Sequence, residues 1–211
     1  MGMLVYIFHS CHTPYQPIKV NLNYKEVPHL QNWVHDAKEL ILIWTSRIGK
    51  TLDIDTYPRN IDLNIIKSEE GIAFTDSNSI TVSSHWIEKH PEDIGLIVHD
   101  VVHVVQLYPK FEPGWVTEGI ADYIRWYIYE KKPLHWFPEG EAEKGFEAAY
   151  RVTAGFFVWI SEYIHSEFIK ILNREMKTGN YSEEIFSREL GKSLDDLWKE
   201  YLIFKSSHFS N

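Results

Sequence analysis

Cysteine is almost missing from this chain of 211 residues. Cys11 is the single cysteine, so the chain cannot form an internal disulfide. A lack of disulfides is typical of a reducing compartment, although many exported bacterial proteins also lack them. The cysteine content therefore excludes a disulfide-stapled fold and leaves the compartment open.

Long apolar runs are missing as well. No stretch approaches the roughly 20 apolar residues that a membrane-spanning helix needs, so we expect no membrane span. The apolar stretch at residues 3–8 is short and has no basic segment before it. It is therefore not a convincing signal peptide.

Positive charge is scarce. The chain has 21 Lys and Arg residues against 30 Asp and Glu residues, which gives a formal net charge of −9, and it has no dense basic run. This acidic average field repels a phosphate backbone, so nucleic acid is not an expected partner. The 44% of hydrophobic residues is typical of a folded globular protein, and the length predicts a single domain, 1–211.

Alternation of apolar and polar residues, the pattern of a half-buried strand, recurs in the first half of the chain. Apolar residues at helical spacing follow Pro28 and predict a helix to about residue 48, which Gly49 ends. We expect a small, mostly antiparallel sheet within about residues 18–110. The expected strands are 18–24, 61–67, 71–74 and 80–82, the last two joined by a turn at 76–78.

From residue 91 onward the sequence predicts helices almost throughout, including a helical second part at about residues 111–206. Pro91 and the two acidic residues after it begin the first helix, and Pro109 stops it. Strands first and helices afterwards favour the α+β class. The expected helices are 94–107, 115–129, 142–164, 166–177, 182–190 and 194–206.

Two histidines stand four residues apart in the first of these helices, in the sequence His99-Asp-Val-Val-His103. This spacing puts both imidazoles on one helix face, one turn apart, where both can reach one tetrahedral metal ion. Apolar residues surround them, so we expect the histidines to be buried. Buried imidazoles need partners, and a metal ion satisfies both at once. The alternative is a pair of core histidines bonded to the backbone or to each other.

The next helix carries two carboxylates at the same spacing, Glu118 and Asp122. A zinc site that keeps one position for water needs a third protein ligand, which Glu118 supplies if the two helices pack antiparallel. Asp122 lies one turn further along, where it can hold a ligand histidine by the other ring nitrogen. The alternative for both residues is a solvated helix face, which their apolar neighbours disfavour.

Several segments resemble known peptidases. The histidine motif resembles the HExxH zinc peptidases, with Asp100 where that pattern has Glu, and the Glu-x-x-x-Asp that follows resembles the gluzincins. Residues 115–125, WVTEGIADYIR, resemble the WxxEGIADxxR segment of the basic secretory protein peptidase family of plants and bacteria. The segments VVHVVQ at 101–106, AYRVTA at 149–154 and LDDLWKEY at 194–201 resemble further parts of that family, in the same order.

This resemblance covers roughly residues 18–205 and implies a zincin-like fold, in which the N-terminal sheet lies over the metal helix. It implies a Zn²⁺ ion bound by His99, His103 and Glu118, with Asp122 supporting a histidine. It also implies a secreted or periplasmic protein, although this chain shows no convincing signal peptide.

The expected substrate is a peptide or protein that binds in extended form. It would add as a strand to an edge strand at 71–74 or 80–82, with Ala73 and Phe74 as candidate contacts. The Tyr150 phenol is a candidate donor to the oxyanion of a tetrahedral intermediate, and its alternative role is aromatic packing. Arg125 is expected to pair with a carboxylate, either in the site or on the surface.

The general-base position is occupied by Asp100, whose side chain is one methylene shorter than Glu. Its carboxylate falls about 1 Å short, and a misplacement of that size costs roughly 100-fold in rate. Three outcomes follow: an adapted active peptidase, a slow one, or an inactive metal-binding protein that binds peptides or proteins. A structural zinc site would need a fourth protein ligand. Cys11 is distant in sequence, although the fold could bring it close in space.

Overall fold

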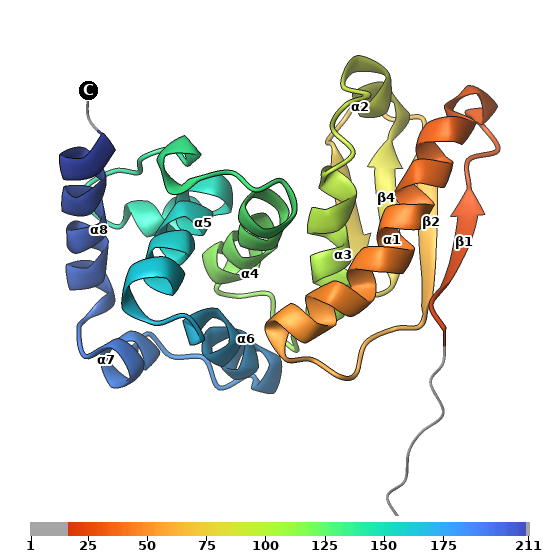
Figure 1. The fold of residues 1–211 in the computed structure, drawn as a ribbon. Coiled ribbons are helices and arrows are strands. Elements are labelled where there is room, and N and C mark those ends of the chain that lie inside the picture. Colours follow the sequence, from red (N-terminus) through yellow and green to blue (C-terminus); the bar gives the residue numbers. More distant parts are fainter. Residues whose placement is uncertain (1–16, 210–211) are drawn as a thin grey trace, which may run out of the picture.

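The computed structural model describes residues 17–209 (Figure 1). Cys11 and the apolar stretch 3–8 lie outside the described residues. Every helix between residues 17 and 209 is too short or too polar to cross a membrane. The strands are β1 (Lys19–Asn23), β2 (Asn60–Ile66), β3 (Ala73–Asp76) and β4 (Ser79–Ser83). The α-helices are α1 (Gln31–Leu52), α2 (Ser84–Lys89), α3 (Leu96–Gln106), α4 (Gly114–Asp122), α5 (Tyr150–Trp159), α6 (Phe168–Thr178), α7 (Glu184–Leu190) and α8 (Leu194–Phe209).

The four strands form one mixed sheet in the order β1-β2-β4-β3. Strands β1 and β2 are parallel, β2 and β4 are parallel, and only β3 and β4 are antiparallel. The prediction of a mostly antiparallel sheet is therefore wrong. The long helix α1 lies between β1 and β2 and returns the chain to the same end of the sheet, so the next strand runs in the same direction.

The edge strand β3 comes before its inner neighbour β4 in the sequence. After β2 the chain passes to the far edge, forms β3, and returns through a tight turn at Ser77 and Asn78 into the gap beside β2. The predicted turn at 76–78 agrees with this hairpin. The structure also decides which of the two strands is the free edge, because β4 pairs on both sides and β3 on one.

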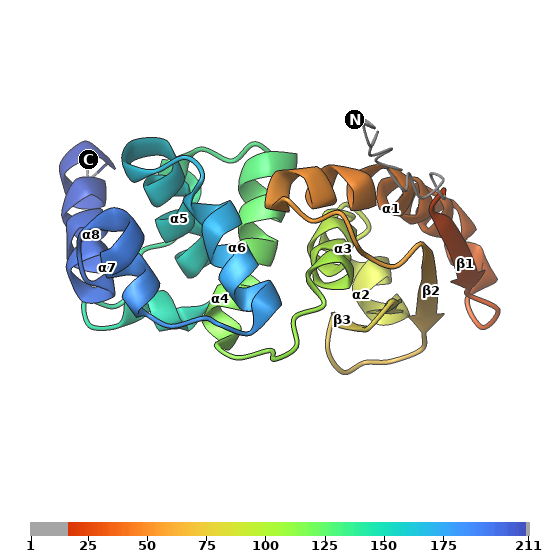
Figure 2. The ribbon, with the colours of Figure 1, turned by 90° about the horizontal axis from the view of Figure 1, so that it is seen from below.

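One face of the sheet is covered by α1 and α3, which lie side by side (Figures 1 and 2). The inward side chains of β2 and β4, such as Leu63 and Ile80, are fully buried against these helices. The opposite face is polar, and on it Asn21 donates to Asp62 across the strands. The sheet and the buried valines of α3 thus hold this helix, which carries His99 and His103, as part of the core.

The second half of the chain is helical, as predicted, and α4 packs against α5 beside the sheet-containing half (Figure 1). The α+β class is thus confirmed. The predicted helix 142–164 is interrupted, because α5 begins only at Tyr150 after a break in the backbone. The predicted stop at Gly49 is also wrong: α1 runs to Leu52, and a Cβ at Gly49 would lie 2.6 Å from the Tyr57 ring. That glycine serves close packing rather than termination.

Candidate metal centre

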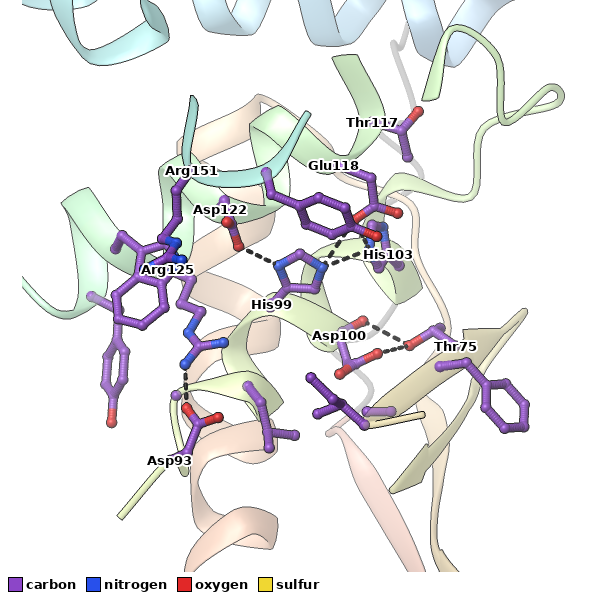
Figure 3. A pocket seen from close by; sticks show the side chains of 18 of the residues that line it. Thr75, Asp93, His99, Asp100, His103, Thr117, Glu118, Asp122, Arg125 and Arg151 are labelled. Carbon is purple, nitrogen blue, oxygen red and sulfur yellow. Dashed lines mark hydrogen bonds and ion pairs between the residues drawn. The ribbon is translucent and has the colours of Figure 1, made fainter. Parts of the chain in front are cut away.

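Helix α3 presents His99 and His103 to a cleft between the two halves of the protein (Figure 3). Its other faces carry Val98, Val101 and Val105, which are fully buried. Leu107, in the left-handed conformation with φ of 36°, ends the helix and turns the chain toward α4. The apolar faces of α3 therefore fix the directions in which its two histidines point.

Three side-chain atoms converge in this cleft, as the sequence predicts. The Nε2 atoms of His99 and His103 are 3.1 Å apart. The Oε2 atom of Glu118, from α4, lies 3.1 Å from the first nitrogen and 3.5 Å from the second. The three side chains are only 13–16% exposed. Among the described residues, they form a group able to hold a metal ion.

The opposite ring nitrogens have fixed partners. His99 donates from Nδ1 to the Asp122 carboxylate at 2.7 Å. His103 donates from Nδ1 to Gln106 Oε1 at 2.9 Å, and Gln106 in turn donates from Nε2 to the Thr117 carbonyl at 3.2 Å. A carbonyl only accepts, so the Gln106 amide can have just one orientation, with its oxygen toward His103. Both neutral imidazoles are therefore protonated on Nδ1.

This tautomer pattern tests whether the group fits a metal ion. With both protons on Nδ1, each Nε2 presents a lone pair, and the Glu118 carboxylate also only accepts. Three acceptors within 3.5 Å of one another have no donor to share unless a cation or an added proton lies among them. Two imidazoles and one carboxylate are ligands that zinc takes in catalytic sites, so the residues fit.

The electrostatics show how strongly this cluster attracts positive charge. Burial lowers the pKa of His99, but its bonds to Asp122 and Glu118 outweigh burial and raise that pKa to about 10. Burial raises the pKa of Glu118, and its bonds to His103 and His99 outweigh that effect and lower it to about 2. The metal-free cluster therefore holds a proton at neutral pH, at the place where a cation fits.

Asp100 lies on the cleft floor between α3 and the edge strand and is 4% exposed. Its Oδ1 atom accepts a hydrogen bond of 2.8 Å from the Thr75 hydroxyl of β3 (Figure 3). Burial raises the pKa of Asp100, and the nearby His99 and His103 oppose this rise. The residue is thus beside the histidines, as predicted, and is also bonded to the edge strand.

Tyr150 lies on the opposite wall, at the start of α5. Its ring is stacked against that of His99, with centroids 6.2 Å apart, and the residue is 54% exposed. The charge of Glu118, with partial burial, raises the pKa of Tyr150, so the phenol keeps its proton at neutral pH. The position and protonation state suit a hydrogen-bond donor toward a bound substrate, and the exposure disfavours a packing role.

The backbone before Tyr150 is strained. Ala149 has φ of 60° and ψ of −168°, a region that is essentially restricted to glycine, and Tyr150 itself has φ of 47°. Replacement of Ala149 by Gly should therefore raise the free energy of unfolding by about 1 kcal/mol, as relief of strain exceeds the added freedom of the unfolded chain. Urea unfolding measures this change.

The matched control is Ala154→Gly, at a buried position inside the same helix, which should destabilise the protein by about 1 kcal/mol. Equal destabilisation by both substitutions would show that the Ala149 conformation is not strained.

The cleft has a volume of about 1560 Å³ and extends along the edge strand. Ala73 and Phe74 line it from β3, and Phe74 is 58% exposed. Both predicted contact residues thus lie on the edge strand and line the same cleft as the three converging atoms. Further exposed apolar residues, Leu107 and Phe111, line the same cleft.

Arg125 also lines the cleft, but it does not pair with the carboxylates of the cluster. Its guanidinium bonds to Asp93, which precedes α3 (Figure 3), and to Glu130 at 3.4 Å. It also lies over the Trp126 ring, with 3.9 Å between the guanidinium carbon and the ring centroid. The sequence left open whether Arg125 pairs with a carboxylate in the site or on the surface. The structure shows an ion pair in the wall of the cleft.

Two polar residues of the site were not identified from the sequence. Gln106 stands three residues after His103 on the same helix, so helical spacing alone signals it. Thr75 lies 25 residues from Asp100, and no local pattern links the two.

Comparison with known proteins identifies the family. A family model described as a peptidase of plants and bacteria matches residues 25–201, which is most of the chain. No curated protein and no solved structure matches the chain significantly. The match agrees with the resemblance of the separated sequence motifs to the basic secretory protein family. The chain therefore belongs to the family of peptidases of plants and bacteria.

Proposed function

We propose that the protein is a zinc-dependent peptidase with a zincin-like fold, which hydrolyses peptide bonds of extended peptides or unfolded proteins. The observation that carries this proposal is the convergence of His99, His103 and Glu118 in a cleft bordered by a free strand edge. Among residues 17–209 this group has three members, which leaves one tetrahedral position for water and favours a catalytic rather than a structural zinc site.

His99, His103 and Glu118 would hold the zinc ion. A zinc ion bound there would lower the pKa of a coordinated water and polarise the scissile carbonyl. Asp122 and Gln106 keep both imidazoles in the tautomer that presents Nε2 to the metal.

The remaining steps fall to residues around this centre. Asp100 would accept the proton of the attacking water and pass it to the leaving amine. The Tyr150 phenol would donate a hydrogen bond to the developing oxyanion. The free edge of β3 would pair with the substrate backbone, as an added strand, and hold the scissile bond in the cleft.

The second candidate function is a peptide-binding member that no longer cleaves. Its support is the short Asp100 side chain, one oxygen of which is already bonded to Thr75. In this case the metal centre and the cleft would persist, and the bound peptide would be released intact.

The protein purified without chelator is expected to contain about one zinc ion per chain and to cleave an unfolded protein substrate. Removal of the metal should abolish cleavage, and added zinc should restore it, because the same ion activates the water. Elemental analysis and a cleavage assay on one preparation measure both quantities. Zinc binding without cleavage would support the second candidate, and failure to take up zinc would contradict both.

A further inference from the structure

The edge strand β3 turns alternate side chains toward α3 and toward solvent. Ala73 and Thr75 are half-buried, whereas Phe74 and Asp76 are exposed. Thr75 is paired in register with Ile80 of β4, which is fully buried against the helices. Paired residues of neighbouring strands share a face, so the Thr75 side chain points toward α3.

Thr75 meets Asp100 on that face. Its hydroxyl donates to Asp100 Oδ1 at 2.8 Å, and it also lies 3.3 Å from the Asp100 carbonyl oxygen. Within residues 17–209, no other side chain forms a hydrogen bond with the Asp100 carboxylate. This bond from the edge strand holds the Asp100 carboxylate in one orientation on the cleft floor.

The second carboxylate oxygen, Oδ2, remains available. It has no hydrogen-bond partner among the described residues, and it is not among their fully buried unpaired atoms. Because Asp100 lines the cleft, this oxygen is open to it. One oxygen is thus held by the edge strand while the other is free to meet a water in the cleft.

We propose that Thr75 is a positioning residue, which holds the short Asp100 side chain in the one orientation that aims Oδ2 at the attacking water. This inference rests on the proposed peptidase function. An aspartate cannot reach as far as a glutamate, so the position of its carboxylate is critical. A displacement of about 1 Å reduces the rate up to roughly 100-fold. The bond from Thr75, which lies on the edge strand, would keep the carboxylate of Asp100 in place.

The position of Thr75 connects substrate binding with the base. Thr75 belongs to the strand whose free edge would pair with the peptide backbone. A peptide added to β3 would stabilise this strand and, through the Thr75 hydroxyl, the orientation of Asp100. The base would then be best ordered when substrate is bound.

Two substitutions at one position test the proposal. Thr75→Val removes the hydroxyl and keeps the shape, and Thr75→Ser keeps the hydroxyl. For the zinc-loaded protein with an unfolded protein substrate, Thr75→Val should reduce kcat about 10-fold, within the range expected for a misplaced base, while KM and zinc content stay unchanged. Thr75→Ser should retain most of the native kcat. The control is Thr81→Val on β4, which lies opposite Phe74 and should behave as the native protein.

A thermal unfolding cycle gives a readout that does not depend on activity. Thr75→Val should lower the melting temperature by about 2–4 °C, the shift that loss of one hydrogen bond causes in a chain of this size. The same substitution in an Asp100→Ala background should cause a clearly smaller decrease, because the bond to the carboxylate is already absent and only the 3.3 Å contact with the backbone carbonyl of residue 100 remains.

The two readouts separate the failure of this inference from failure of the proposed function. If the native protein cleaves and Thr75→Val has native kcat, or Thr75→Ser is as impaired as Thr75→Val, the positioning role is overturned and the peptidase function stands. If the native protein is inert, the proposed peptidase function is wrong, and the kinetic role of Thr75 is wrong as well. Additive melting shifts would overturn the bond between Thr75 and Asp100 itself.

Discussion

Glu118→Ala is expected to abolish tight zinc binding. Glu118 supplies the one anionic ligand atom of the cluster, 3.1 and 3.5 Å from the two histidine nitrogens. Without it two neutral imidazoles remain, and the catalytic type of zinc site needs three protein ligands. The loss should exceed the roughly 10- to 100-fold that removal of an outer-shell partner causes. Competition with a chromogenic chelator measures the affinity.

Asp122→Asn is the matched comparison, because Asp122 bonds to the far side of the His99 ring. An amide still accepts the hydrogen bond but no longer carries the charge, so zinc affinity should fall by only about 10- to 100-fold. Near-ultraviolet circular dichroism of each variant would verify the fold. Complete loss of zinc binding in both variants would show that Asp122 is as essential as Glu118 and contradict the roles of ligand and supporting residue given to them. Loss in Asp122→Asn alone would make Asp122 the ligand.

Asp100→Glu is expected to leave zinc affinity nearly unchanged and to change peptidase activity strongly. If the native carboxylate is too short, the added methylene restores its reach, and activity should rise by up to about 100-fold. If the site has adapted to aspartate through Thr75, the longer side chain loses that bond and crowds the water, and activity should fall. The structure favours the second direction, because the Thr75 bond already occupies one oxygen of the shorter side chain.

Asp100→Ala completes this series. It should remove the native activity while zinc stays bound, because residue 100 is not a ligand. The values of kcat and KM for the three proteins on one unfolded substrate, with zinc content measured in parallel, distinguish the cases. If native, Asp100→Glu and Asp100→Ala proteins are equally inert with zinc bound, the non-catalytic, peptide-binding function replaces the peptidase.

The sheet shows where sequence reasoning about the fold fails. Periodicity located all four strands to within a few residues, because alternation of burial is a local property of each strand. The direction of each strand depends on its connection instead. The 22-residue helix α1 between β1 and β2 is the signal of a parallel pair, because a crossover of this length returns the chain to the same end of the sheet.

The break at Ala149 is a different case. The sequence from 142 to 164 has the apolar spacing of a continuous helix. An alanine at position 149 gives no indication of a backbone conformation that is restricted to glycine. Helix α5, which begins directly after this break, packs against α4. At this position, which borders the candidate site, tertiary structure overrides the local preference for a continuous helix. Such exceptions are common at functional sites.

Helical spacing is enough to put His99 and His103 on one helix face and Glu118 and Asp122 on one face of the next helix, because such pairs do not depend on the rest of the chain. Three further features follow only from contacts between elements: β3 is the free edge, Gln106 fixes the His103 tautomer through Thr117, and Thr75 bonds to Asp100. The free edge is decided by the pairing of β4 with β2, and the Thr75 bond connects the edge strand with α3. Both contacts join elements that are separated in the chain. The tautomer depends on how α3 packs against the start of α4, and no local periodicity encodes such a contact.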